Sequence, residues 1–124
     1  MRLACNKPVV NINLKNGVYV LDNESSTGKT YLLGILKTLS VGEPVIGFTY
    51  SDYKSGNILE ASIRGRELIM FDRYDRYKNN YIDIINEMRD SAIILLDCKN
   101  KTNLRLKTEP CYMTLTDNSI EVEE

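Results

Sequence analysis

The stretch that decides the fold spans residues 18–36 and reads Val-Tyr-Val-Leu-Asp-Asn-Glu-Ser-Ser-Thr-Gly-Lys-Thr-Tyr-Leu-Leu-Gly-Ile-Leu. Its apolar first part, residues 18–22, is typical of a buried strand. Leucine and isoleucine then recur at helical spacing from Leu32 to Leu39, which predicts a helix over residues 29–40. A polar loop between a strand and a helix aims backbone N–H groups at an anion, so we expect this loop to bind phosphate.

The loop carries a recognisable pattern of residues. Gly28, Lys29 and Thr30 match the second half of G-x-x-x-x-G-K-[ST], and Asn23 stands where the first glycine is expected. Asparagine tolerates a positive φ better than most residues, so the pattern is weakened but kept. Lys29 would neutralise the outer phosphates and Thr30 would bind Mg²⁺. The predicted nucleotide-binding residues are Asn23, Glu24, Ser25, Ser26, Thr27, Gly28, Lys29 and Thr30.

A second apolar run ends in an acidic residue. Residues 67–72 read Glu-Leu-Ile-Met-Phe-Asp, which predicts a buried strand with Asp72 at its end. Mg²⁺ takes one or two protein oxygens and completes its shell with phosphate oxygens and water. Thr30 and Asp72 are therefore the predicted metal-binding residues. The alternatives are that Asp72 only caps the strand and that Ser26 or Thr27 only caps an ordinary helix.

From residue 9 to residue 97 the chain resembles P-loop NTPases, in particular the additional-strand group with the RecA-like, AAA and ABC ATPases. The resemblance implies that residues 24–30 are the Walker A loop and that Asp72 is the Walker B aspartate, which holds Mg²⁺ through water. In that group a catalytic glutamate usually follows this aspartate, but Arg73 stands there in this chain. Asp75 is the remaining candidate to polarise the attacking water. The predicted catalytic residues are thus Asp72 and Asp75, with slow turnover or binding alone.

Two further features leave alternatives open. Asp97 ends the apolar run 92–97, at a position that in this family often carries a polar residue facing the γ-phosphate; structural capping is at least as good an explanation. Tyr74, Tyr77 and Tyr81 alternate with basic residues and could stack on a base or single strand. Amphipathic tyrosines at a helix edge or an interface are the preferred explanation.

The order of the predicted elements defines the expected fold. Near-continuous apolar runs predict parallel strands covered on both faces over residues 45–50, 67–72 and 92–97. Further helices are predicted over residues 57–64 and 79–89. We expect one P-loop NTPase-like domain over residues 1–124: a three-layer α/β fold with a mostly parallel central sheet, helices on both faces and antiparallel edge strands.

The edge strands of the expected sheet are predicted from turn residues and from alternating apolar and polar residues. Asn16 and Gly17 favour a tight hairpin turn, which would pair residues 9–14 with residues 18–21 in antiparallel fashion. Short alternating strands are expected in an antiparallel flank over residues 104–107, 112–116 and 120–122.

Composition narrows the class of protein. The 124 residues suffice for one core, and their net charge of −1 gives no general attraction to nucleic acid or to an anionic membrane. No apolar run approaches the roughly 20 residues that a membrane helix needs. The absence of histidine excludes a histidine base or ligand, and the spacing of Cys5, Cys98 and Cys111 fits no zinc pattern. We expect reduced thiols in a cytoplasmic protein.

The sequence thus predicts a nucleotide-binding protein that takes ATP and Mg²⁺, with weak ATPase activity as a further expectation. A nucleotide is the expected partner, with a larger protein or further copies of the chain as additional partners. The alternative is an inactive P-loop scaffold that binds protein or nucleic acid. The small size, Asn23 in place of glycine and Arg73 after Asp72 favour this alternative.

Overall fold

The computed structural model describes residues 1–4, 8–22, 26–100 and 104–124. The strands, in chain order, are β1 Arg2–Ala4, β2 Val9–Asn13, β3 Gly17–Leu21, β4 Val45–Phe48, β5 Leu68–Phe71, β6 Ile93–Leu96, β7 Glu109–Leu115 and β8 Ser119–Glu123. The helices are α1 Ser26–Leu39, α2 Tyr50–Lys54, α3 Glu60–Ile63, the 3₁₀ turn η1 Tyr74–Arg76 and α4 Ile82–Met88.

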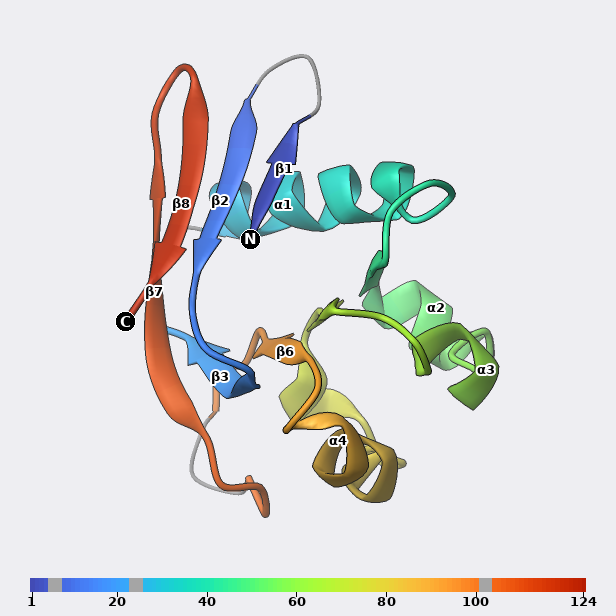
Figure 1. Cartoon of the computed structure of the whole chain (residues 1–124). Helices are drawn as coiled ribbons and strands as arrows, with labels where there is room; N and C mark the ends of the chain where they lie inside the picture. The colour runs from blue at the N-terminus through green and yellow to red at the C-terminus, as the bar shows by residue number, and fades with distance from the viewer. Residues whose placement is uncertain (5–7, 23–25, 101–103) are drawn as a thin grey trace.

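All eight strands form one sheet of mixed direction in the order β1-β2-β8-β7-β3-β6-β5-β4. The pairs β1·β2 and β7·β8 are antiparallel, and the other neighbouring pairs are parallel. The sheet is strongly curled: β1, β2 and β8 rise beside α1, while β3 and β6 lie away from them (Figure 1). The result is a half-barrel that curves around one long helix.

The predicted three-layer α/β P-loop fold with a mostly parallel central sheet is therefore wrong. β2 pairs with β8, and β8 pairs with β7, so the N-terminal and C-terminal segments join the same sheet. Curling brings this half of the sheet around α1, so strands rather than solvent enclose that helix on more than one side. The closure depends on pairing between residues more than 100 positions apart in the chain, which local patterns do not encode.

The predicted hairpin at Asn16 and Gly17 is also wrong. β2 and β3 do not pair with each other, because β2 lies between β1 and β8 while β3 lies between β6 and β7. The N–H of Gly17 instead donates to the carbonyl of Ala92 at 3.0 Å. The segment is a connection between two regions of the sheet rather than a hairpin.

Several local predictions are confirmed. The apolar runs form the parallel strands β4, β5 and β6, and the helical spacing corresponds to α1 and to a shorter α4. Only residues 60–63 of the predicted helix 57–64 are helical, and residues 104–107 do not form a strand. The antiparallel flank is confirmed in β7 and β8.

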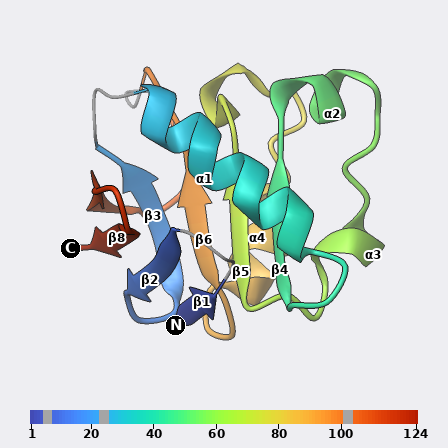
Figure 2. The same ribbon diagram turned by 90° about the horizontal axis from the view of Figure 1, so that it is seen from above.

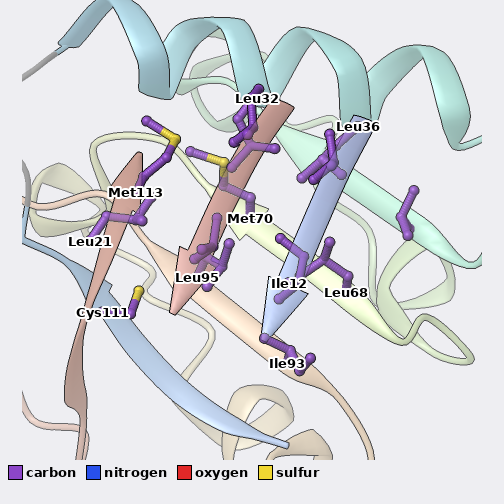
Figure 3. Close-up of a cluster of buried hydrophobic side chains, with 14 of the residues drawn as sticks. Ile12, Leu21, Leu32, Leu36, Leu68, Met70, Ile93, Leu95, Cys111 and Met113 are labelled. Carbon is purple, nitrogen blue, oxygen red and sulfur yellow. The ribbon is translucent and has the colours of Figure 1, made fainter. Parts of the chain in front are cut away.

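The first half of the core lies inside the curl. Leu32 and Leu36 of α1 are fully buried against residues of all the strands that surround them, among them Ile12, Leu68 and Met113 (Figure 3). β4 passes very close to this helix: a Cβ on Gly47 would lie 2.8 Å from Leu33 Cδ1 and 3.1 Å from its carbonyl oxygen. The close approach of strand and helix therefore requires glycine at this position.

The second half of the core lies on the other face of the sheet. There α3, η1 and α4 pack with the alternate side chains of β3, β5 and β6 and with several tyrosines. Seen from above, β3, β6, β5 and β4 run side by side with α1 across them (Figure 2). Because these four strands are parallel, their carboxyl ends share one edge of the sheet.

Candidate functional site

Three charged side chains meet at this edge. Lys29 lies in the first turns of α1, the helix that follows β3, while Asp72 follows β5 and Asp97 follows β6. β6 lies between β3 and β5, so the two aspartates sit at adjacent strand ends. Backbone hydrogen bonds fix these ends: the N–H of Asp72 donates to the carbonyl of Phe48, and that of Asp97 to the carbonyl of Phe71, each at 2.9 Å.

Lys29 and Asp97 form an ion pair. Lys29 Nζ lies 3.1 Å from Asp97 Oδ1, and the two side chains are only 12% and 16% exposed. The pair is therefore partly withdrawn from water, where Coulomb attraction is stronger than on an open surface. An ammonium group at the start of a helix also adds to the partial positive charge of the helix N-terminus.

The Asp72 carboxyl lies against the same pair. It shares a hydrogen bond with the carboxyl of Asp97 and accepts another from the backbone N–H of Tyr50. Burial raises the pKa of Asp72 above its ordinary value of 3.8, and the contact with Asp97 raises this pKa further, against the opposing charge of Arg73.

The turn after Asp72 is backbone-strained. Arg73 has φ 50°, in the left-handed region that costs a non-glycine residue about 1–2 kcal/mol. This conformation lets the next N–H, that of Tyr74, donate to the carbonyl of Asp97 at 2.8 Å. The turn thereby ties the chain after β5 to the end of β6 and holds the two aspartates together. Strain of this kind is concentrated at functional sites.

The structure places the other predicted loop residues at or before the start of α1. Asn23, Glu24 and Ser25 lie outside the described residues. Ser26 and Thr27 are the first two residues of α1. Gly28 is buried, and Thr30 is exposed beside Lys29, where it also lines an apolar groove of about 300 Å³ along α1.

Asp75 has other neighbours than the two aspartates at the strand ends. Its Oδ2 accepts a hydrogen bond from the backbone N–H of Asn100 at 3.0 Å. Burial raises the pKa of the Cys98 thiol, and the negative charge of Asp75 raises this pKa further. The structure thus gives Asp75 a structural contact, and its catalytic role stays a prediction.

The arrangement sets one cationic side chain beside two carboxyl groups. Within the described ranges, no group of three or more histidine, cysteine, aspartate or glutamate side chains could hold a metal ion by itself. Mg²⁺ does not need such a cage, because it keeps several waters and uses one or two carboxylates with substrate phosphates. Asp72 offers one such carboxylate beside the cation Lys29, and the roles of both residues toward magnesium and phosphate stay predictions.

Sequence reasoning missed the part that Asp97 plays. The sequence leaves Asp97 open between a residue that faces the γ-phosphate and a strand cap, whereas the structure makes it the partner of both Lys29 and Asp72. A signal existed: Asp97 ends an apolar run just as Asp72 does, and parallel neighbouring strands bring such ends together. The backbone N–H of Tyr50 could not have been identified in this way, because backbone donors leave no trace in a side-chain pattern.

Comparisons of the chain with protein-family profiles, with curated proteins and with solved structures found no match. In the part of the chain that the structure describes, no helix is both long and apolar enough to span a bilayer.

Proposed function

We propose that this chain binds a nucleoside triphosphate, ATP in the first place, together with Mg²⁺. The observation that carries the proposal is the meeting of Lys29 with Asp72 and Asp97 at the start of α1. Lys29 supplies a full positive charge for the outer phosphates, and Asp72 holds a metal-bound water. The resemblance of residues 24–30 and 68–72 to the Walker A and Walker B segments supports this proposal, and β6 lies between β3 and β5, the strands that lead to Lys29 and Asp72.

Both Lys29 and Asp72 must change partners when the magnesium nucleotide binds. Lys29 is neutralised by Asp97 at 3.1 Å and must leave it to reach a phosphate. Asp72 would hold Mg²⁺ through water, and its contact with the Asp97 carboxyl would then give way. Thr30, exposed on the same helical turn, supplies the second metal ligand.

Turnover is proposed to be slow. Phosphoryl transfer to water needs a group that orients the attacking water in line with the γ-phosphate. Arg73 follows Asp72 where a glutamate would serve, and Asp75 is engaged with the N–H of Asn100. The chain therefore acts chiefly as a nucleotide-binding protein with weak ATPase activity.

We further place the protein in the cytoplasm. Cys98 and Cys111 are buried free thiols, which suits a reducing compartment. The net charge of this chain is −1, which gives no general attraction to nucleic acid. We therefore propose a larger protein or another copy of the chain as its partner.

Isothermal titration calorimetry with ATP tests the proposal, in Mg²⁺ and again in EDTA. Wild type should bind saturably with Mg²⁺, and Lys29→Ala should bind no nucleotide. The proposal fails if wild type shows no magnesium-dependent affinity at millimolar ATP.

An inactive interaction module is the second candidate. It is favoured by the Lys29–Asp97 ion pair, since a lysine that is neutralised by an aspartate can serve the fold alone. On this view the charged cluster fixes the sheet edge, and nucleotide has no effect on the thermal stability of the protein. A rise in melting temperature with Mg²⁺ and ATP, absent in Lys29→Ala, separates the two functions.

A further inference from the structure

An apolar groove of about 300 Å³ runs along one side of α1. Two neighbouring rows of the helix line it, namely Thr30, Gly34 and Thr38 in one row and Tyr31, Ile35 and Leu39 in the other. Ile35 and Leu39 are partly buried against the core, which holds this wall of the groove in place. Tyr31 is 47% exposed. The groove is therefore a fixed apolar surface that the described part of the chain leaves accessible.

The glycine in the middle of this groove is not required by the fold. Gly34 lies inside α1, where glycine makes a helix less stable than alanine would. A Cβ on Gly34 would meet no described atom within 4 Å, whereas a Cβ on Gly47 would collide with Leu33. Packing thus explains Gly47 and does not explain Gly34. The missing side chain keeps the floor of the groove flat, and such glycines allow a ligand to approach the backbone closely.

The groove begins at the proposed phosphate site. Thr30 lines the groove and directly follows Lys29, whose Nζ lies 3.1 Å from Asp97. Because an α-helix rises about 1.5 Å per residue, the groove extends about 13 Å from residue 30 to residue 39. A ligand with its phosphates at the start of α1 can lay the rest of its length along this groove.

The lining suits a planar aromatic group. Tyr31 provides an aromatic ring, and Ile35 and Leu39 provide aliphatic surface. The hydroxyl of Thr38 donates to the carbonyl of Gly34 at 3.1 Å, so it is turned back onto the helix and leaves the floor apolar. Nucleobases stack on aromatic side chains whatever their hydrogen-bonding edges, because every base has a π-face.

We propose that the groove along α1 binds the nucleoside part of the ligand, with the base stacked on Tyr31 and lying over Gly34. The inference rests on the proposed function, in which Lys29 and Thr30 hold the phosphates and the magnesium ion. One turn of α1 then serves both ends of the ligand, since Thr30 and Tyr31 are adjacent. Inorganic tripolyphosphate lacks the base, so it uses the phosphate site and leaves the groove empty.

The test measures binding of magnesium-ATP and of magnesium tripolyphosphate by calorimetry. Tyr31→Ala should weaken magnesium-ATP binding at least about fivefold and leave tripolyphosphate binding unchanged, while Tyr31→Phe should keep the affinity of wild type. Gly34→Leu fills the groove and should weaken magnesium-ATP binding at least about tenfold. The same variant should melt a few degrees higher than wild type, because leucine favours the helix more than glycine does. A loss of affinity in a more stable protein does not come from misfolding.

The matched control is Gly42→Leu. Gly42 also stands in open space among the described residues, but it lies outside α1 and the groove. This variant adds the same side chain and should bind both ligands as wild type does.

The outcomes separate this inference from the function on which it rests. If wild type binds both ligands and neither Tyr31→Ala nor Gly34→Leu weakens ATP binding, the groove does not hold the base, and the phosphate site stands. Equal losses for ATP and tripolyphosphate also overturn the role of the groove, as does an equal loss in Gly42→Leu. If wild type binds neither ligand, the proposed function and the role of the groove are both overturned.

Discussion

Lys29→Met and Asp97→Asn remove the same ion pair from opposite sides. At the observed 3.1 Å, an effective dielectric constant of about 20 gives a gross attraction of about 5 kcal/mol. Desolvation offsets most of this. Exposed pairs contribute about 0–1 kcal/mol and breaking a buried pair costs about 3–5 kcal/mol. With side chains 12% and 16% exposed, we expect Lys29→Met to lower the free energy of unfolding by about 1–3 kcal/mol.

The two variants should differ in stability. Lys29→Met leaves Asp97 facing Asp72 without a cation, so the repulsion between the carboxyls is no longer compensated. Asp97→Asn leaves Lys29 without a partner but removes that repulsion, and the loss should be smaller. Urea unfolding at pH 7.5 measures the free energy of unfolding of both variants. In thermal unfolding, Lys29→Met should lower the melting temperature by roughly 4–12 °C for a chain of this size.

Nucleotide binding should separate the variants further. Lys29→Met should bind no magnesium-ATP, because the ammonium group is gone. Asp97→Asn frees Lys29 and removes a negative charge near the phosphates, so magnesium-ATP should bind at least about fivefold tighter, equivalent to roughly 1 kcal/mol. Equal stability losses combined with unchanged affinity in both variants would refute the reasoning, since the pair would then be a purely structural contact.

Three further predictions address the fold and its titrating groups. Gly47→Ala should destabilise the protein by about 1–3 kcal/mol in urea unfolding, because its Cβ would meet Leu33 at 2.8 Å; an unchanged midpoint would show that α1 and β4 can separate freely. The pKa of Asp72 is raised in the folded chain, so the stability it contributes is present below its ordinary pKa of 3.8 and is lost as the pH rises through the raised value. Asp72→Asn should therefore be more stable than wild type at pH 7.5, by a margin that shrinks toward pH 4, and a constant margin would contradict this. Burial raises the pKa of the Cys98 and Cys111 thiols to about 12, so at pH 8 both should react with a thiol reagent only as fast as the chain unfolds, and immediate labelling in the native state would disprove their burial.

The parts of the fold that could be predicted are those set by local side-chain patterns. The spacing of Leu32, Leu36 and Leu39 identifies α1, since burial along one side of a helix repeats at that period. The continuous apolar runs identify β4, β5 and β6, because both faces of these strands are covered. Such patterns describe the immediate surroundings of each element and are therefore visible in the sequence.

The curl of the sheet could not be predicted, because it depends on which strands pair. The alternating pattern of β2 shows a half-buried strand but leaves its partner open, and the nearest candidate, β3, is the wrong one. Register and closure are fixed by distant pairs such as Val10 with Ile120. A local turn signal at Asn16 and Gly17 could not compete with this pairing.

The candidate site divides in the same way. Lys29 and Asp72 could be predicted because each stands at the end of a recognisable element. The ion pair with Asp97 and the hydrogen bond from Tyr50 N–H depend on the strand order, so they emerge only from the structure. The apolar groove beside Tyr31 likewise emerges only from the structure.

The central claim is that Lys29 exchanges a carboxylate for a phosphate. A crystal structure of the chain with Mg²⁺ and a non-hydrolysable ATP analogue tests it most directly. We predict a phosphate oxygen within about 3 Å of Lys29 Nζ, with Asp97 no longer paired to it and Asp72 bound to a magnesium water. An intact Lys29–Asp97 contact at 3.1 Å, with no phosphate at the start of α1 under saturating analogue, would contradict it.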